Sequence, residues 1–168
     1  MRNSSQLLCL AVLCLSSSAL AFTKVGNAHY VASRDPITDE NTSTIGLPER
    51  DDTTYATVLS IGCVKARPSV SLSVKFQIVN DAGELPKVVY RAGSGTPQGA
   101  HVTAGMPGDP RQASNTVTFS QADSQRLLSG GVHSSRVAVE TLAQGVRTTY
   151  VFPTLGLAKA WKATGHCG

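Results

Sequence analysis

The 168-residue chain has few charged and few aromatic side chains, which make up 15% and 5% of it. Its lysines and arginines occur singly along the chain and form no run. Because proteins that bind nucleic acids or membrane surfaces gather their basic residues into patches, this pattern argues against both classes. The longest apolar run covers only residues 7–15, whereas a membrane-spanning helix needs about 20 apolar residues.

Motifs for metal binding and nucleophilic catalysis are also missing. The histidines His29, His101, His133 and His166 are far apart, so no pair has the short spacing of zinc ligands. No Gly-x-Ser-x-Gly motif is present, although a catalytic triad built from remote residues leaves no such signature. We therefore predict no catalytic residue, no metal site and no cofactor. We also expect that neither His101 nor His133 lies within about 2.6–3.2 Å of a serine or carboxylate, as a general base would.

Three weaker motifs favour ordinary structure over a site. Residues 93–95 (Gly-Ser-Gly) are superficially similar to a phosphate-binding loop, but no helix follows to bind the anion, so we predict a β-turn. Asp35, Asp39 and Glu40 lack the spacing of a calcium-binding loop and indicate an exposed acidic segment. The glycosylation sequon that begins at Asn41 matters only in a eukaryotic host.

The first 21 residues have the three zones of a secretory signal peptide. Arg2 supplies the positive start, residues 7–15 supply the apolar centre, and Ala19-Leu20-Ala21 has the small residues that signal peptidase recognises. We predict cleavage before Phe22. The product is expected to be periplasmic or secreted, with no stable membrane insertion after cleavage.

Two cysteines remain after the predicted cleavage, Cys63 and Cys167. An even pair in an exported domain is most simply one disulfide, because the compartments outside the cytoplasm are oxidising. Two buried free thiols are the alternative. A zinc site is disfavoured, since no clustered histidine completes a tetrahedral set of ligands.

The sequence divides into three parts. Residues 1–21 are the predicted signal peptide, residues 22–50 are predicted to be an extended N-terminal arm, and residues 51–168 are predicted to form one β domain. The arm is assigned because residues 33–50 are polar, contain two prolines and show no regular apolar period. The length after residue 21 suits a single domain.

Alternating apolar and polar residues predict the strands of this domain. The strongest alternation covers residues 70–78, whose apolar positions are Val70, Leu72, Val74, Phe76 and Ile78. Such a segment is typical of a sheet with one face on the core and one in water. Further strands are expected at residues 57–63, 87–91, 101–103, 115–119, 135–142 and 146–152, the last two as a hairpin.

Two helices are also predicted. Ser120 is expected to cap a short helix that ends at the glycine pair 130–131. A second helix, residues 155–163 with Thr154 as its N-cap, carries Trp161 on an apolar stripe. The predicted fold is mainly β: a single antiparallel β-sandwich-like domain with a short middle helix and a C-terminal helix packed on the sheet. The predicted core comprises Leu72, Val74, Phe76, Val139, Tyr150, Phe152, Leu157 and Trp161.

A series of landmarks runs through the β domain in a particular order. They are Asp51-Asp52, Cys63 with Pro68 and the strand SLSVKF, Val89-Tyr90-Arg91, Phe119 with Leu127 and Leu128, Arg136-Val137-Ala138-Val139, Phe152 with Leu155-Gly156-Leu157-Ala158, and Cys167. In this order, residues 51–168 resemble the TagO-type accessory proteins of bacterial type VI secretion. The resemblance implies a shared fold and a periplasmic, non-enzymatic module of a Gram-negative bacterium or its phage.

The function predicted from these observations is an exported periplasmic accessory or binding module of the bacterial cell envelope, associated with type VI secretion. Its partner would be another envelope or periplasmic protein, bound at a loop or a sheet edge. The alternative is a small periplasmic inhibitor of a peptidoglycan hydrolase, similar to lysozyme inhibitors and encoded by a phage. It would insert loop 92–100 or loop 104–112 into its target. A third class is an enzyme whose site is assembled only in the folded chain.

Overall fold

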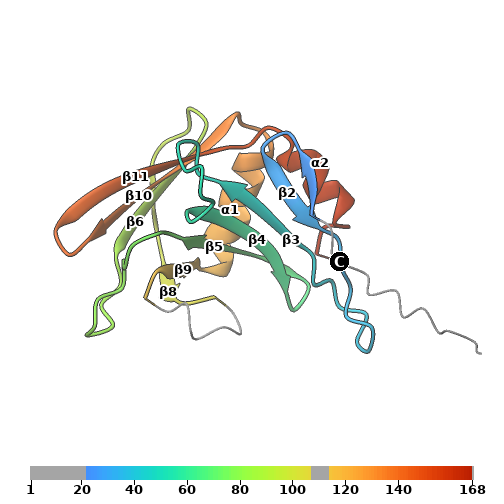
Figure 1. The fold of residues 1–168 in the computed structure, drawn as a ribbon, viewed down its shortest axis with the longest axis horizontal. Helices are drawn as coiled ribbons and strands as arrows, with labels where there is room; N and C mark the ends of the chain where they lie inside the picture. The colour runs from blue at the N-terminus through green and yellow to red at the C-terminus, as the bar shows by residue number, and fades with distance from the viewer. Residues whose placement is uncertain (1–21, 107–113, 168) are drawn as a thin grey trace, which may run out of the picture.

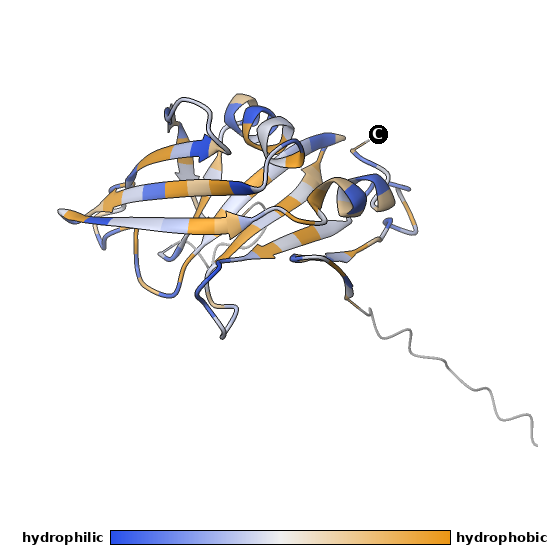
Figure 2. Cartoon of the chain, turned by 90° about the horizontal axis from the view of Figure 1, so that it is seen from above, coloured by the Kyte–Doolittle hydropathy of each residue, from blue (hydrophilic) through white to orange (hydrophobic). Residues whose placement is uncertain are grey.

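The computed structural model describes residues 22–106 and 114–167, so the predicted signal peptide at residues 1–21 lies outside the described residues. The described chain is mainly β, with two antiparallel sheets and two helices, as predicted (Figure 1). Along the strands, apolar positions alternate with polar ones (Figure 2). This alternation lets each sheet place one face on a shared core.

The larger sheet contains seven strands. In spatial order they are β1 (Thr23–Val25), β2 (Ala28–Val31), β3 (Thr44–Pro48), β4 (Val58–Val64), β5 (Arg67–Ser73), β9 (Thr116–Phe119) and β8 (Val102–Ala104). The β4–β5 hairpin turns through Lys65 and Ala66, which both have positive φ, as the tightest hairpin turns require.

The expectation of an N-terminal arm at residues 22–50 is wrong, because this segment supplies three strands of the larger sheet. β3 pairs with β4 and faces Ile45 to Ile61 and Leu47 to Leu59, all four of them buried. The strands β1 to β3 are only three to five residues long. The alternation of apolar and polar residues in such short strands does not stand out in the sequence. Pairing with a neighbouring strand nevertheless stabilises each of these strands.

The smaller sheet contains four strands. In spatial order they are β11 (Val146–Pro153), β10 (Arg136–Ala143), β6 (Lys87–Ala92) and β7 (Gln98–Ala100). The predicted hairpin of β10 and β11 is confirmed, and Gln144 and Gly145 form its two-residue turn with positive φ at both. β11 lies at one edge of this sheet and β7 at the other.

The two helices are α1 (Gln121–Val132) and α2 (Leu157–Ala163). Ser120 is the N-cap of α1, as predicted, and its hydroxyl accepts a hydrogen bond from the N–H of Asp123 at 3.2 Å. The predicted end of this helix at residues 130–131 is wrong. A Cβ at Gly130 would lie 2.7 Å from the Ala92 side chain, so the glycine serves close packing against β6 instead of ending the helix.

The second helix starts later than predicted. Its N-cap is Gly156 and not Thr154. The Thr154 hydroxyl instead donates to the carbonyl of Ser134, so it is not available to the first turn. α2 packs on β1, β2 and β3, which confirms a C-terminal helix on the sheet.

The core lies between the sheets and the helices. α1 contacts β5 of the larger sheet and both β6 and β10 of the smaller one. Of the predicted core, Leu72, Val74, Val139, Phe152 and Leu157 are buried, while Tyr150 and Trp161 are partly buried and pack against its rim. The assignment of Phe76 to the core is wrong, because its side chain is 73% exposed.

A close backbone contact joins the start of α2 to the β1–β2 turn. The N–H of Asn27 donates to the carbonyl of Leu155 at 2.7 Å. Gly156 has φ +93°, and a Cβ at this position would lie 1.8 Å from the carbonyl oxygen of Val25. Glycine is therefore required here both for its conformation and for its lack of a side chain.

Gly156→Ala is expected to lower the free energy of unfolding by more than the strain of a left-handed residue, about 1–2 kcal/mol, because β1 must also move away. Gly145→Ala is the matched control, since Gly145 has φ +79° with open space around its Cβ position. Urea denaturation of both variants measures the difference. Equal losses would show that the contact with β1 contributes nothing.

Candidate functional site

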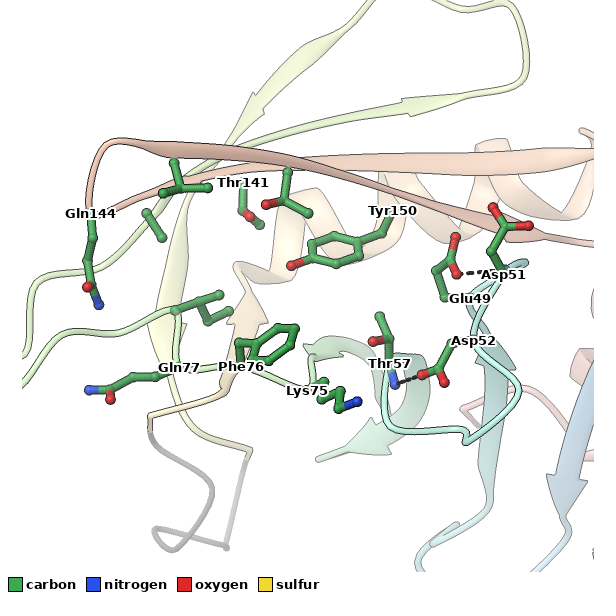
Figure 3. Close-up of a pocket in the computed structure, with 14 residues that line it drawn as sticks. Glu49, Asp51, Asp52, Thr57, Lys75, Phe76, Gln77, Thr141, Gln144 and Tyr150 are labelled. Carbon is green, nitrogen blue, oxygen red and sulfur yellow. Dashed lines mark hydrogen bonds between the residues drawn. The ribbon is translucent and has the colours of Figure 1, made fainter.

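A cleft of about 620 Å³ lies between the β10–β11 hairpin, residues 75–78 and the loop that joins β3 to β4. The hairpin forms one wall and Phe76 the opposite one, with the rings of Phe76 and Tyr150 on opposite sides of the cleft (Figure 3). The loop closes one end of the cleft with three carboxylates, Glu49, Asp51 and Asp52. This cleft is the candidate functional site.

Phe76 reaches the cleft because the chain leaves the sheet after β5. The N–H groups of Val74 and Ile78 donate to the carbonyls of Asn115 and Ser114, each at 2.9 Å. The two donors are four residues apart, whereas their acceptors are adjacent residues. Residues 75–77 must therefore loop outward between the two hydrogen bonds. The predicted strand 70–78 therefore ends at Ser73, and Phe76 lies in a surface segment.

The hairpin wall is one face of two paired strands. Thr141 on β10 is opposite Thr148 on β11, and Ala143 is opposite Val146, so their side chains share a face. That face lines the cleft, and the side chain of Val146 is 65% exposed. The alternation in β11 was predicted correctly, but the hairpin extends beyond the core and exposes this part of its apolar face.

The end of the cleft at the β3–β4 loop is acidic. Three carboxylates and one cation, Lys75, line the cleft, which leaves an excess of negative charge. Asp51 is exposed and pairs with Arg50 at 3.1 Å. Glu49 connects the loop to β11, since its two carboxylate oxygens accept from the N–H of Val151 at 3.4 Å and from that of Asp51 at 2.7 Å.

Asp52 organises the β3–β4 loop. Its carboxylate accepts from the hydroxyl and the N–H of Thr54, at 2.6 and 2.8 Å, and from the N–H of Thr57 at 2.6 Å. Hydrogen bonds from Thr54, with a smaller contribution from Thr57, lower the pKa of Asp52 to about 2. Asp52 therefore stays anionic in the folded protein at pH values where an ordinary aspartic acid is protonated.

The lowered pKa predicts a pH-dependent contribution to stability. A carboxyl group with a depressed folded-state pKa stabilises the fold above its ordinary pKa and loses this contribution as the pH falls toward 2. Asp52→Asn should therefore melt below the wild type at neutral pH, and the difference should shrink between pH 4 and 2. Thermal melts at several pH values measure it, and a difference that stays constant with pH would contradict the assignment.

A smaller cleft of about 280 Å³ lies on the other side of the same loop and shares Glu49 and Asp52 with the first. Tyr55, which is exposed, lines it and packs edge-to-face on His29 with a centroid distance of 5.6 Å. Tyr55 has φ +57°, a conformation that is strained for an aromatic residue and is often found at functional sites. The loop thus presents carboxylates to both clefts and the ring of Tyr55 to the smaller one.

The four histidines lie in different places. His29 packs on Tyr55, His166 packs on Trp161 at 5.3 Å, and His133 is the C-cap of α1. His101 is almost fully exposed, and its Nδ1 lies 3.7 Å from the carboxylate of Asp123, which is longer than a hydrogen bond. None of the four lines the larger cleft.

Asp123 is a buried carboxylate that connects α1 to the segment before β8. Burial opposes its ionisation, but hydrogen bonds from the Ser120 hydroxyl at 2.7 Å and the His101 N–H at 3.0 Å outweigh it and keep the pKa of Asp123 below its ordinary value. Arg126 and the His101 ring add favourable charge at its edge. These contacts are those of a helix cap and hold the first turn of α1 in place.

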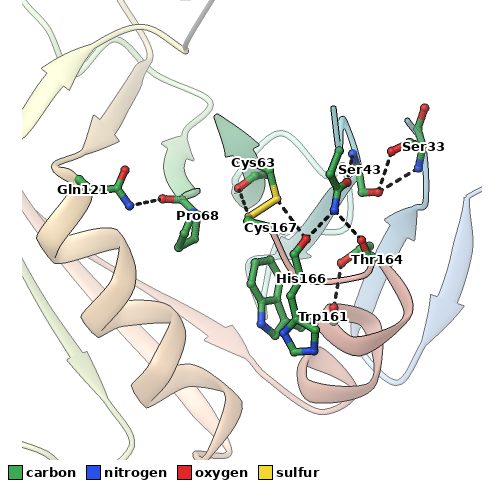
Figure 4. Close-up of a disulfide and its surroundings, with 11 residues drawn as sticks. Ser33, Ser43, Cys63, Pro68, Gln121, Trp161, Thr164, His166 and Cys167 are labelled. Atoms are coloured by element: carbon green, nitrogen blue, oxygen red, sulfur yellow. Dashed lines mark hydrogen bonds between the residues drawn. A yellow bond between two sulfur atoms is a disulfide. The ribbon is translucent and has the colours of Figure 1, made fainter. Parts of the chain in front are cut away.

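The disulfide is formed between Cys63 and Cys167, whose Cα atoms are 5.5 Å apart, as predicted (Figure 4). It joins β4 to the segment after α2. The Asn41 amide donates to the carbonyls of Thr164 and His166, next to this bond. The nitrogen of the glycosylation sequon is therefore engaged in holding the end of the chain.

The remaining sequence motifs form local turns. Gly95 donates to the carbonyl of Ala92 at 3.0 Å, which makes the predicted turn. Asp35 accepts from the N–H groups of Ile37 and Thr38, while Asp39 pairs with Arg34 at 3.7 Å. Part of the other candidate loop, residues 107–112, lies outside the described residues.

Across residues 22–106 and 114–167, no group of three or more His, Cys, Asp or Glu side chains is placed to hold a metal ion. Neither of the helices described there is long and apolar enough to span a membrane. Comparisons with protein families, with curated proteins and with solved structures find no match. The function is therefore inferred from the geometry of the cleft itself.

Sequence reasoning missed this cleft, although it noted several of its residues. Phe76 and Tyr150 were assigned to the core, and Asp51-Asp52 served only as a landmark. The useful signal is the pair Asp51-Asp52 between two apolar segments, because a polar loop that joins strands lies on the surface. Nothing in the sequence indicates that Phe76 is exposed, because the alternation of apolar and polar residues continues unbroken through residue 78.

Proposed function

We propose that this protein is an exported, non-enzymatic binding module of the bacterial cell envelope, which holds part of a partner protein in the cleft between the β10–β11 hairpin and Phe76. The observation that carries the proposal is the pair of exposed apolar side chains on the two walls, Phe76 and Val146, with Tyr150 on the same wall as Val146. The resemblance of residues 51–168 to TagO-type proteins supports a periplasmic role in type VI secretion. The Cys63–Cys167 disulfide suits an oxidising compartment.

The energetics favour a partner at this cleft. Single exposed apolar residues are common on protein surfaces and need no explanation. Here, however, two of them face one cleft and an aromatic ring lies beside them. Covering a side chain of this size contributes about 1.5–3 kcal/mol, and aromatic residues at the centre of an interface often dominate its affinity.

Site-specific photocrosslinking tests the proposal. A photoreactive phenylalanine analogue at position 76, in a cell that exports the protein, should give a discrete adduct with an envelope protein that mass spectrometry identifies. The same analogue at Gln125, on the exposed face of α1, should give none. With the identified partner purified, Phe76→Ser should weaken binding by about tenfold or more.

Other outcomes separate the alternatives. No adduct at position 76, or equal adducts at positions 76 and 125, would contradict a binding cleft. The alternative function, inhibition of a peptidoglycan hydrolase, places contact at loop 92–100. An adduct with such a hydrolase formed at the exposed Ser94, and not at position 76, would therefore favour the inhibitor.

A further inference from the structure

The outer edge of β11 borders the cleft. β11 is the edge strand of the smaller sheet, and within the described part of the chain no strand pairs with its outer side. An unpaired edge presents a row of backbone N–H and C=O groups to which an extended chain can bind. Which groups face outward follows from the register of the hairpin.

Alternate residues of β11 face β10 and the open edge. The pair Ala143 and Val146 closes the two-residue turn, so Val146 and Thr148 bond to β10 and Arg147 and Thr149 face outward. Val151 lies on the same outward row and confirms this assignment. Its carbonyl accepts from the N–H of Arg50 at 2.9 Å, and its N–H donates to Glu49.

The β3–β4 loop therefore occupies only one end of the edge. At Val151 the edge is closed by Arg50 and Glu49, whereas among the described residues the backbone groups of Arg147 and Thr149 have no partner on that side. The open stretch lies beside the wall formed by Val146, Thr148 and Tyr150. It leads directly to the acidic end of the cleft.

We infer that the partner binds by adding an extended segment to β11, with one apolar side chain in the cleft and a lysine or arginine two positions away at the acidic end. This inference rests on the proposed function and specifies how the partner binds. Side chains of an added strand alternate between the two faces of the sheet. Those opposite Val146, Thr148 and Tyr150 point into the cleft.

Each part of the cleft matches one part of this segment. An apolar side chain opposite Thr148 lies between Val146 and Phe76. The next side chain on the same face, opposite Tyr150, is directed toward the loop that carries Glu49 and Asp51. A cation at that position is attracted by the excess of carboxylates, and pairs of this kind favour the correct partner and register.

A second copy of the chain fits this site less well. The residues of β11 that face the cleft, Val146, Thr148 and Tyr150, include no cation. Arg147 lies on the opposite face, where it pairs with Glu140 at 3.0 Å. Pairing of two β11 edges would thus leave the acidic end without a positive partner.

Synthetic peptides test the mode of binding on the exported full-length protein. Two nine-residue threonine peptides carry one leucine and, two positions away, one lysine, in the two possible orders. One of them should bind, and N-methylation of the amides that face β11 should weaken it about tenfold or more. Lysine→glutamate should weaken it as well. A Kd above about 1 mM for both peptides would overturn the inference.

Hydrogen exchange locates the contact. The amide protons of Arg147 and Thr149 should be protected when the peptide is added, and that of Ser94 in a remote loop should not. Binding that N-methylation leaves unchanged, with no protection at these two amides, would overturn strand addition. That result would not contradict the proposal that the cleft binds a partner.

A variant of the edge separates this inference from the proposed function. Thr149→Pro removes an outward N–H for which no described residue is an acceptor, and Thr149→Val keeps it, so only the proline variant should lose the crosslinked partner. Melting curves check that both variants fold. If Thr149→Pro binds this partner normally while Phe76→Ser does not, strand addition is wrong and the cleft proposal stands. A homodimer that Thr149→Pro abolishes in sedimentation would assign the edge to a second copy.

Discussion

Replacing Cys63 and Cys167 together by alanine is expected to lower the free energy of unfolding by about 4–5 kcal/mol. The bond closes a loop with a sequence separation of 104 residues, and a cross-link over such a long loop removes much of the conformational freedom of the unfolded chain. Domains of this size are stable by about 5–15 kcal/mol. The disulfide would therefore account for a large part of the total.

Urea denaturation of the oxidised wild type, the reduced wild type and the double alanine variant measures this contribution. The last two should unfold at similar, lower urea concentrations, and reductant should not affect the variant. The Asn41 amide still holds the carbonyls of Thr164 and His166 without the disulfide. The variant should therefore keep α2 in place at low urea. A loss below about 1 kcal/mol would mean that the unfolded chain is already constrained by residual structure.

The features predicted correctly depend on chemistry close in sequence or on very few possibilities. Only two cysteines follow residue 21, so their pairing had a single solution. The β10–β11 hairpin has long alternating strands and a glycine in its turn, and Ser120 caps α1 because its hydroxyl can reach an N–H three residues on. The signals for the hairpin and the helix cap each lie within one short segment of the chain and need no knowledge of the rest of the fold.

The errors have the opposite origin, because they depend on contacts distant in sequence. β3 is a strand because it pairs with β4, although its own alternation is short. β5 ends at Ser73 because the carbonyls of Ser114 and Asn115 bind the chain on both sides of Phe76. The candidate cleft has the same origin, since its walls come from three segments that only the folded chain brings together.

Phe152→Ala is expected to cost about 3–5 kcal/mol, the range for large aromatic residues in a core. Phe152 is the largest of the fully buried side chains and lies opposite Val137, which is also fully buried, in the β10–β11 pairing. Its removal leaves a cavity that the neighbouring strands cannot close without breaking their pairing. Trp161, which the sequence predicts to be an equally important core residue, is partly buried and packs at the rim. Trp161→Ala should therefore cost less.

Phe76→Ala is the matched control, because it makes the same chemical change at a side chain that is 73% exposed. An exposed substitution of this kind changes stability by about 0.5 kcal/mol or less, so its urea midpoint should match that of the wild type. The two phenylalanines thus separate folding from binding: one variant should unfold easily, and the other should fold normally and lose its partner. A large loss of stability in Phe76→Ala would place its ring in the core. Residues 75–77 would then form no wall of a cleft, and the binding site proposed here would be wrong.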